Sequence, residues 1–114
     1  MKKQIADMWV DALRSGEFKQ GFNNLEKDGT NCCLGVLCNL ALVEGVCDYD
    51  SSRDVSRFDE MSAHLPNSVM EWAGMVSCYG SKVDGETSLI NLNDRAITSF
   101  NKIADAIEKN YEKL

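Results

Sequence analysis

Two cations, two glycines and two phenylalanines fall within a short stretch near the start of the chain, residues 14–23. Glycine lets backbone N–H groups approach a ligand closely. Arginine and lysine bind anions, and a phenylalanine ring stacks on a base. The segment therefore predicts a binding site for a small anionic or nucleotide-type ligand, with these candidate residues: Arg14, Phe18, Lys19, Gln20, Gly21 and Asn23. A structural alternative stays open, in which a helix stops here and a tight hairpin follows, with Arg14 on the helix dipole and the phenylalanines in the core.

A second polar pair, Asn93 and Asp94, precedes the last predicted helix. Its simplest role is to cap that helix, because asparagine and aspartate are favoured N-cap residues. The free N–H groups of a helix start also bind anions. We therefore add Asn93 and Asp94 to the candidate ligand-binding residues.

The five cysteines do not follow the spacing of a zinc site, which usually presents two close ligand pairs. They lie at positions 32, 33, 38, 47 and 78, and the chain has a single histidine, His64. Cysteine is among the most buried residue types, so we expect buried, reduced thiols and neither a metal nor a cofactor. A Cys–His dyad would need His64 as its base, and no feature of the sequence selects it.

The sequence favours a binding protein over an enzyme. It contains no phosphate-binding loop, dinucleotide fingerprint or serine-nucleophile motif. A small hydrolase that uses carboxylates or a cysteine remains an alternative, because the chain has 18 acidic residues. Most of these fall on predicted polar faces or in turns, where solvation is the ordinary role.

The charge balance argues against direct nucleic-acid binding. The net charge is −6 and the pI is about 4.7, without a basic patch. An acidic chain is repelled by phosphates but fits a basic groove on a protein partner. No apolar run approaches the ~20 residues of a membrane span, and the polar start is unlike a signal peptide. We expect a cytoplasmic protein, with self-association as a way to cover leftover apolar surface.

Hydrophobic periodicity predicts one α+β domain over residues 1–114. Amphipathic helices at the two ends should pack on a central buried helix, Cys32–Val43, which Thr30 or Asn31 would cap. Gly35 within that helix predicts close approach of a neighbouring helix or strand. Gly16 and Gly74 should end the first helix and a short helix at Pro66–Ala73.

The rest of the chain predicts short elements. Residues 75–79 and 88–92 should form an antiparallel hairpin around the turn 80–86, and residues 26–29 should form a turn. Residues 47–57 predict an irregular polar loop, and residues 58–65 a short helical turn. The last helix should bury one stripe of residues: Ile97, Phe100, Ile103, Ala104, Ile107, Tyr111 and Leu114.

Five motifs occur in a specific order: W-x3-LRSG-x-F-x-QG (9–21), CCLGVLC (32–38), LP-x2-V-x2-WAG (65–74), LND (92–94) and SF-x2-IAD-x-IE (99–108). Over nearly the whole chain they resemble a family of small proteins encoded by tailed bacteriophages. Two positions depart from that family, which usually has glycine near Asn23 and a glycine with a shorter run in place of residues 95–98. The resemblance implies a phage accessory protein that acts in the cytoplasm of the infected bacterium.

These observations lead to three hypotheses. In the first, a phage protein counters host defence by binding a nucleotide-type ligand without turnover, as a sponge. In the second, an acidic inhibitor binds a host defence or transcription complex. The third is the small hydrolase.

Overall fold

The computed structural model describes residues 1–52, 54–81 and 87–114. Helix α1 (Lys3–Arg14) forms because its apolar residues repeat at helical spacing, and that stripe is buried: Ala6, Trp9, Val10 and Leu13. The helix ends at Ser15, and Gly16 follows with a left-handed φ of 80°. The predicted first helix and its glycine stop are confirmed.

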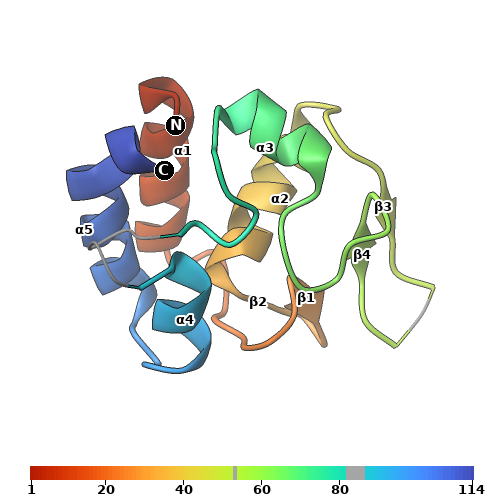
Figure 1. Ribbon diagram of the computed structural model, residues 1–114. Coiled ribbons are helices and arrows are strands. Elements are labelled where there is room, and N and C mark those ends of the chain that lie inside the picture. Colours follow the sequence, from red (N-terminus) through yellow and green to blue (C-terminus); the bar gives the residue numbers. More distant parts are fainter. Residues whose placement is uncertain (53, 82–86) are drawn as a thin grey trace.

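Helix α5 (Phe100–Asn110) lies alongside α1, and both lie on the same side of the central helix, with α1 in contact with it (Figure 1). Its buried stripe contains Phe100, Ile103, Ala104 and Ile107. Two sequence-based details are wrong. Ser99 caps the helix, not Asn93 or Asp94, and Ile97 lies before the helix with 69% of its surface exposed.

Helix α2 (Cys33–Val43) occupies the centre of the fold, with its first six residues buried. It is apolar on every side because other elements surround it. A Cβ atom built at Gly35 would lie only 1.7 Å from the carbonyl oxygen of Leu25. The predicted close approach at Gly35 is therefore confirmed, but its partner is not the predicted helix or strand, because Leu25 lies in the loop just before the first strand. The predicted cap at Thr30 or Asn31 is wrong, because Cys32 is the N-cap residue and its side chain makes no capping bond.

The described residues contain two short antiparallel hairpins. In the first, β1 (Glu26–Lys27) pairs with β2 (Thr30–Asn31) around the turn that Asp28-Gly29 predicts. In the second, β3 (Tyr49–Asp50) pairs with β4 (Arg57–Phe58), where an irregular loop was predicted. Residues 59–65 form turns and bends, with one isolated bridge between Phe58 and Met61, instead of the predicted helical turn.

The hairpin predicted from residues 75–79 and 88–92 is wrong. Residues 75–79 form no strand, and the second segment folds as helix α4 (Leu89–Asp94). The Ser88 side chain explains the helix, because it accepts a hydrogen bond from Asn91 N as an N-cap. Most of the predicted turn, residues 82–86, lies outside the described residues.

Two small helical elements complete the chain. Helix α3 (Asn67–Ala73) starts after Pro66, one residue later than predicted, and Gly74 ends it with a left-handed φ of 72°. A 3-10 turn, η1 (Tyr111–Lys113), follows α5 and leaves Leu114 buried. No helix among the described residues is long and apolar enough to span a membrane.

Candidate functional site

Asn93, in the last turn of α4, is a fully buried polar residue that joins three parts of the chain. Its Oδ1 atom accepts hydrogen bonds from Gln20 Nε2 (2.9 Å) and from Cys33 N (3.1 Å). Its Nδ2 atom donates to Gly21 O (2.9 Å) and to Asp94 Oδ1 (2.8 Å). An amide side chain has two donors and two acceptor lone pairs. All four are used, so Asn93 holds the 20–21 segment, the start of α2 and Asp94 in fixed positions.

Asp94 is held from two sides. Besides Asn93, the backbone N–H of Asn23 donates to Asp94 Oδ1 (3.0 Å). Asn23 has a left-handed φ of 69°, which asparagine tolerates better than most residues. This conformation at Asn23 orients its N–H group towards the end of α4.

Gly21 and Gln20 complete the connection between residues 20–23 and α4. Gln20 Nε2 also donates to Thr98 O (2.8 Å), beyond the end of that helix. Gly21 N donates to Asn31 O (2.7 Å), and a Cβ atom at Gly21 would lie 2.2 Å from Thr30 Oγ1. The close approach that Gly21 permits is therefore to β2.

A pocket of about 440 Å³ opens beside Asp94, and the residues around it include Asn23, Tyr79, Ile90, Asn91 and Arg95. They combine an aromatic ring, an apolar side chain, two amides, a carboxylate and a guanidinium. Pockets for small molecules typically join apolar surface with a few polar groups that fix the ligand's orientation.

Several of these groups are free to meet a ligand. In the described part of the chain, the side chains of Asn23, Asn91 and Arg95 have no hydrogen-bond or ion-pair partner. Tyr79 is 48% exposed, and its ring meets the His64 ring edge-on, with centroids 5.6 Å apart. That contact supports one side of the Tyr79 ring.

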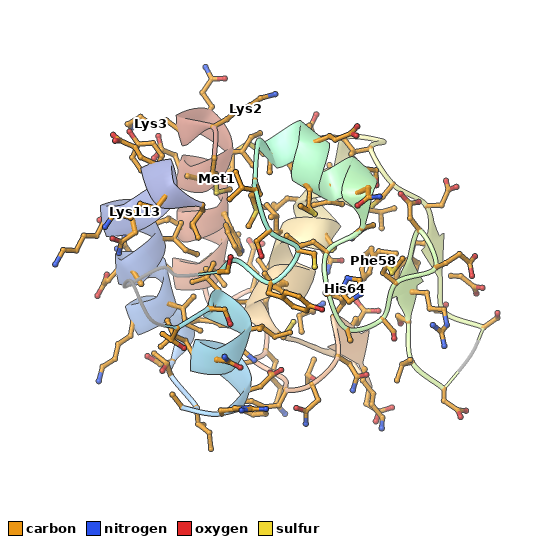
Figure 2. The ribbon with its side chains drawn as sticks, viewed as in Figure 1. Met1, Lys2, Lys3, Phe58, His64 and Lys113 are labelled. Atoms are coloured by element: carbon orange, nitrogen blue, oxygen red, sulfur yellow. The ribbon has the colours of Figure 1, made fainter. Side chains whose placement is uncertain are left out.

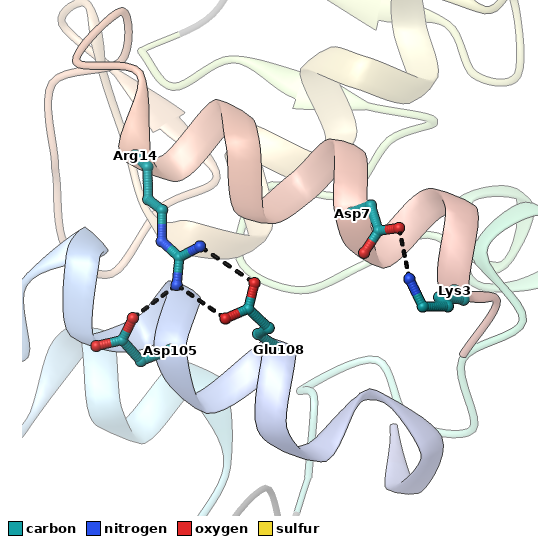
Figure 3. Close-up of polar contacts among 5 residues, drawn as sticks. All are labelled: Lys3, Asp7, Arg14, Asp105 and Glu108. Atoms are coloured by element: carbon teal, nitrogen blue, oxygen red, sulfur yellow. Dashed lines mark hydrogen bonds and ion pairs between the residues drawn. The ribbon is translucent and has the colours of Figure 1, made fainter.

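Arg14 does not line this pocket. Figure 3 shows its guanidinium turned from the end of α1 towards two carboxylates of α5. It contacts Asp105 Oδ1 at 2.7 Å and the two oxygens of Glu108 at 3.2 and 3.3 Å. The three side chains are exposed, so water screens the ion pairs and they add little to stability. Arg14 therefore forms ion pairs that connect α1 to α5.

Phe18 and Lys19 also lie outside the lining of the pocket. Phe18 is half-buried and packs against the hydrophobic core, as the structural alternative predicted. Two other parts of that alternative are wrong, because Phe22 is exposed and residues 15–25 form no hairpin. Lys19 is exposed, and its carbonyl accepts a hydrogen bond from Asn31 N (2.9 Å). Of the eight candidate residues, the structure brings together Gln20, Gly21, Asn23, Asn93 and Asp94.

Three lining residues, Tyr79, Asn91 and Arg95, are not among the residues predicted from the sequence. Arg95 directly follows Asn93-Asp94, so its position next to two candidate residues could have indicated it. Tyr79 was assigned to a strand that does not form. Its place at the pocket depends on packing between residues distant in the sequence.

A second pocket, of about 310 Å³, lies at the β3–β4 hairpin and is acidic. Asp48, Asp50, Asp59 and Glu60 line it with Tyr49 and Arg57. The Tyr49 hydroxyl donates to Glu26, which raises the pKa of Tyr49.

The cysteines are buried in four of five cases, and Cys78 is half-buried. Burial raises the pKa of Cys32 and of Cys47 to about 11, and it raises the pKa of Cys33 and Cys38 as well. A thiol with a raised pKa is a poor nucleophile at neutral pH.

Figure 2 places His64 with Phe58 between α2 and the β3–β4 hairpin. Among residues 1–52, 54–81 and 87–114, no group of three or more potential ligands could hold a metal.

A family model described as "Domain of unknown function (DUF8296)" matches residues 1–111. The match covers nearly the whole chain, and the chain belongs to that family. Neither a curated protein nor a solved structure matches it.

Proposed function

We propose that this member of the DUF8296 family binds a small anionic, nucleotide-type ligand in the pocket beside Asp94, without turnover. The observation that carries the proposal is the pocket itself. Free recognition groups line it, and the fully bonded Asn93, which lies outside the lining, holds the lining residue Asp94 in place. Such support keeps a site in its binding geometry before the ligand arrives.

The lining matches the parts of a nucleotide. Tyr79 offers a half-exposed ring on which a base stacks. Arg95 offers a guanidinium for a phosphate. Asn23 and Asn91 offer amides that donate to and accept from base or sugar groups. The volume of about 440 Å³ lies within the usual range for small-ligand pockets.

The biological role that we propose follows the resemblance to tailed-phage proteins. In the cytoplasm of an infected bacterium, a protein that binds a nucleotide-derived signal without hydrolysing it lowers the free concentration of that signal. This would counter a host defence that depends on it. Self-association remains part of the proposal.

Isothermal titration calorimetry tests the binding. The panel contains nucleoside monophosphates, cyclic nucleotides and ADP-ribose derivatives, and chromatography of each mixture tests for turnover. Arg95→Ala and Tyr79→Ala should each weaken binding about tenfold or more, because each removes one ligand contact. Lys109→Ala is the matched control, since it removes an exposed positive charge from α5.

Two results would reject the proposal. One is that the wild-type protein binds no member of the panel. The other is that Arg95→Ala binds as tightly as the wild type. Lys19 belongs to the segment predicted from the sequence but does not line the pocket. We therefore expect Lys19→Ala to leave the affinity for the ligand unchanged.

A second candidate function is inhibition of a host defence or transcription complex through the acidic hairpin. The observation in its favour is that the pocket at β3–β4 carries four carboxylates. Such a surface steers onto a basic groove, and the attraction weakens with salt. A pull-down from host lysate at low salt should recover a stoichiometric partner that high salt releases. Failure to recover one would count against this function.

A further inference from the structure

The protein uses one oxygen of the Asp94 carboxylate and leaves the other open to solvent. Oδ1 accepts from Asn23 N at 3.0 Å and from Asn93 Nδ2 at 2.8 Å, which fills both of its lone pairs. In the described part of the chain, Oδ2 has no hydrogen-bond partner. The one buried side-chain polar atom without a partner in that part is Arg57 Nε. Asp94 Oδ2 is therefore not buried, and a ligand can reach it.

The position of this free oxygen is fixed. Asn93, which holds Oδ1, is fully buried and uses its amide in four hydrogen bonds. Rotation of the Asp94 side chain would leave Asn93 Nδ2 and Asn23 N without this acceptor, which is costly for a buried donor. Since Asp94 lines the pocket, Oδ2 is a fixed acceptor at its edge.

A fixed carboxylate oxygen determines which ligand group is placed next to it. The oxygen only accepts hydrogen bonds, so it attracts an O–H or N–H group and repels a phosphate oxygen. A ligand that covers Asp94 Oδ2 without donating to it leaves a charged acceptor unpaired, which weakens binding. Because Oδ1 is already filled, Asp94 offers one acceptor atom. Two-oxygen pairing with the adjacent N–H donors of a guanine edge is therefore disfavoured.

We infer that Asp94 determines the sugar specificity of the pocket, by accepting a hydrogen bond from a ribose hydroxyl of the bound nucleotide. This inference rests on the proposed function. Arg95, the proposed phosphate contact, directly follows Asp94, so their Cα atoms are about 3.8 Å apart. The sugar is the part of a nucleotide that adjoins the phosphate, and its hydroxyls are neutral donors. The N–H donors of the bases lie on ring edges farther from the phosphate. The pocket should therefore prefer ribonucleotides to deoxyribonucleotides.

Matched ligands isolate the hydroxyl. The 5′-monophosphates of adenosine, guanosine, cytidine and uridine are titrated into the wild-type protein by calorimetry, each beside its 2′-deoxy and 3′-deoxy forms. The three forms carry the same charge, so every charged group around the pocket acts on them alike. We expect at least one ribonucleotide to bind. Removal of its 2′- or its 3′-hydroxyl should weaken binding about tenfold or more, because a hydrogen bond to a charged acceptor is lost. The weaker deoxy form identifies the hydroxyl.

Asp94→Asn tests whether this carboxylate makes the contact. Asparagine keeps a carbonyl oxygen for Asn23 N and Asn93 Nδ2, and it replaces Oδ2 by a neutral amide group. Charge-assisted hydrogen bonds are about twice as strong as neutral ones, so a tenfold ratio should fall to about threefold or less. Loss of the charge affects the ribo and deoxy forms equally and leaves their ratio unchanged. Asp11→Asn, on the exposed face of α1, is the charge-matched control and should keep the wild-type ratio. Melting curves check that both variants fold, and the wild-type ratio needs no variant.

Each outcome decides the inference. It is overturned if both deoxy forms bind as tightly as the ribonucleotide, or if folded Asp94→Asn keeps the wild-type ratio. In both cases a nucleotide still binds, so the proposed function stands. The inference is also overturned if none of these monophosphates binds. The cyclic nucleotides and ADP-ribose derivatives of the calorimetric panel then decide the proposed function separately.

Discussion

Gly35→Ala should destabilise the protein, although alanine is the better helix former. In an exposed helix interior this change stabilises by about 1 kcal/mol. In α2 the new Cβ atom would lie 1.7 Å from Leu25 O and 2.6 Å from Leu25 C. Non-bonded heavy atoms need about 3.5 Å, so the two segments must separate by more than 1 Å.

The neighbouring backbone has little freedom to make that shift. Leu25 N donates to Ser62 O at 2.7 Å, and Asn31 Nδ2 donates to Leu25 O at 3.0 Å. The Leu25 side chain is fully buried. Overpacking at a rigid site costs about 1–3 kcal/mol and sometimes more. A backbone clash falls at the upper end, which leaves a net loss of about 2 kcal/mol after the gain in helix propensity.

Urea unfolding followed by circular dichroism measures this difference. A loss of about 2 kcal/mol corresponds to a melting temperature roughly 10 °C lower for a domain of this size. Val43→Ala is the control on the same helix, because Val43 is 86% exposed and should change stability by less than about 0.5 kcal/mol. If Gly35→Ala were as stable as the wild type, the packing of Leu25 on α2 would be refuted.

Three further predictions concern the site and the thiols. Asn93→Ala should lower the free energy of unfolding in urea by about 3 kcal/mol or more, because it leaves Cys33 N and Gly21 O buried without their partner. The control is Asn101→Ala, at an exposed position. Equal losses of stability in the two variants would contradict the prediction. Ile97→Asn should stabilise by about 1 kcal/mol, because Ile97 has a φ of 50° that costs a β-branched residue more than asparagine; a lower melting temperature would count against this. Stability should fall as the pH rises from 9 to about 11, because the unfolded chain loses thiol protons that buried Cys32 and Cys47 keep until about pH 11. Unfolding curves across that range test the slope, which Cys32→Ala should flatten.

The helices at the two ends and the centre of the chain were predictable because each carries its signal locally. In α1 and α5 the apolar residues repeat at helical spacing, and the buried stripes follow that repeat. Helix α2 is apolar on all sides, which indicates full burial before any neighbour is known. Gly35 within it correctly marked a close approach, although the approaching segment was not identifiable.

The short elements were not predictable in the same way. The β1–β2 hairpin has two-residue strands, too short for an alternating pattern, and only its Asp28-Gly29 turn was visible. Residues 89–94 mix apolar and polar side chains in an order that fits a strand or a helical turn. The Ser88 cap and the packing of Leu89 favour the helix.

The candidate site was only partly visible in the sequence. Gln20 and Asn93 were selected for separate reasons, and the sequence did not indicate that they bond to each other across 73 positions. The residue type of Arg14 does not show whether it binds a ligand or pairs with carboxylates of the same chain. Its direction depends on how α1 packs on α5, which brings Asp105 and Glu108 within reach.

The contacts of Asn93 also bear on how the protein folds. They join residues 60, 72 and 73 positions apart, so each requires a large loop to close. Closing such loops costs chain entropy before the contacts repay it, which places them late in folding. The hydrogen bonds that hold Asp94 beside the pocket then exist only in the fully assembled chain. A ligand that needs Asp94 in this position binds the native state alone and raises the melting temperature with its concentration, so thermal stability becomes a direct readout of occupancy.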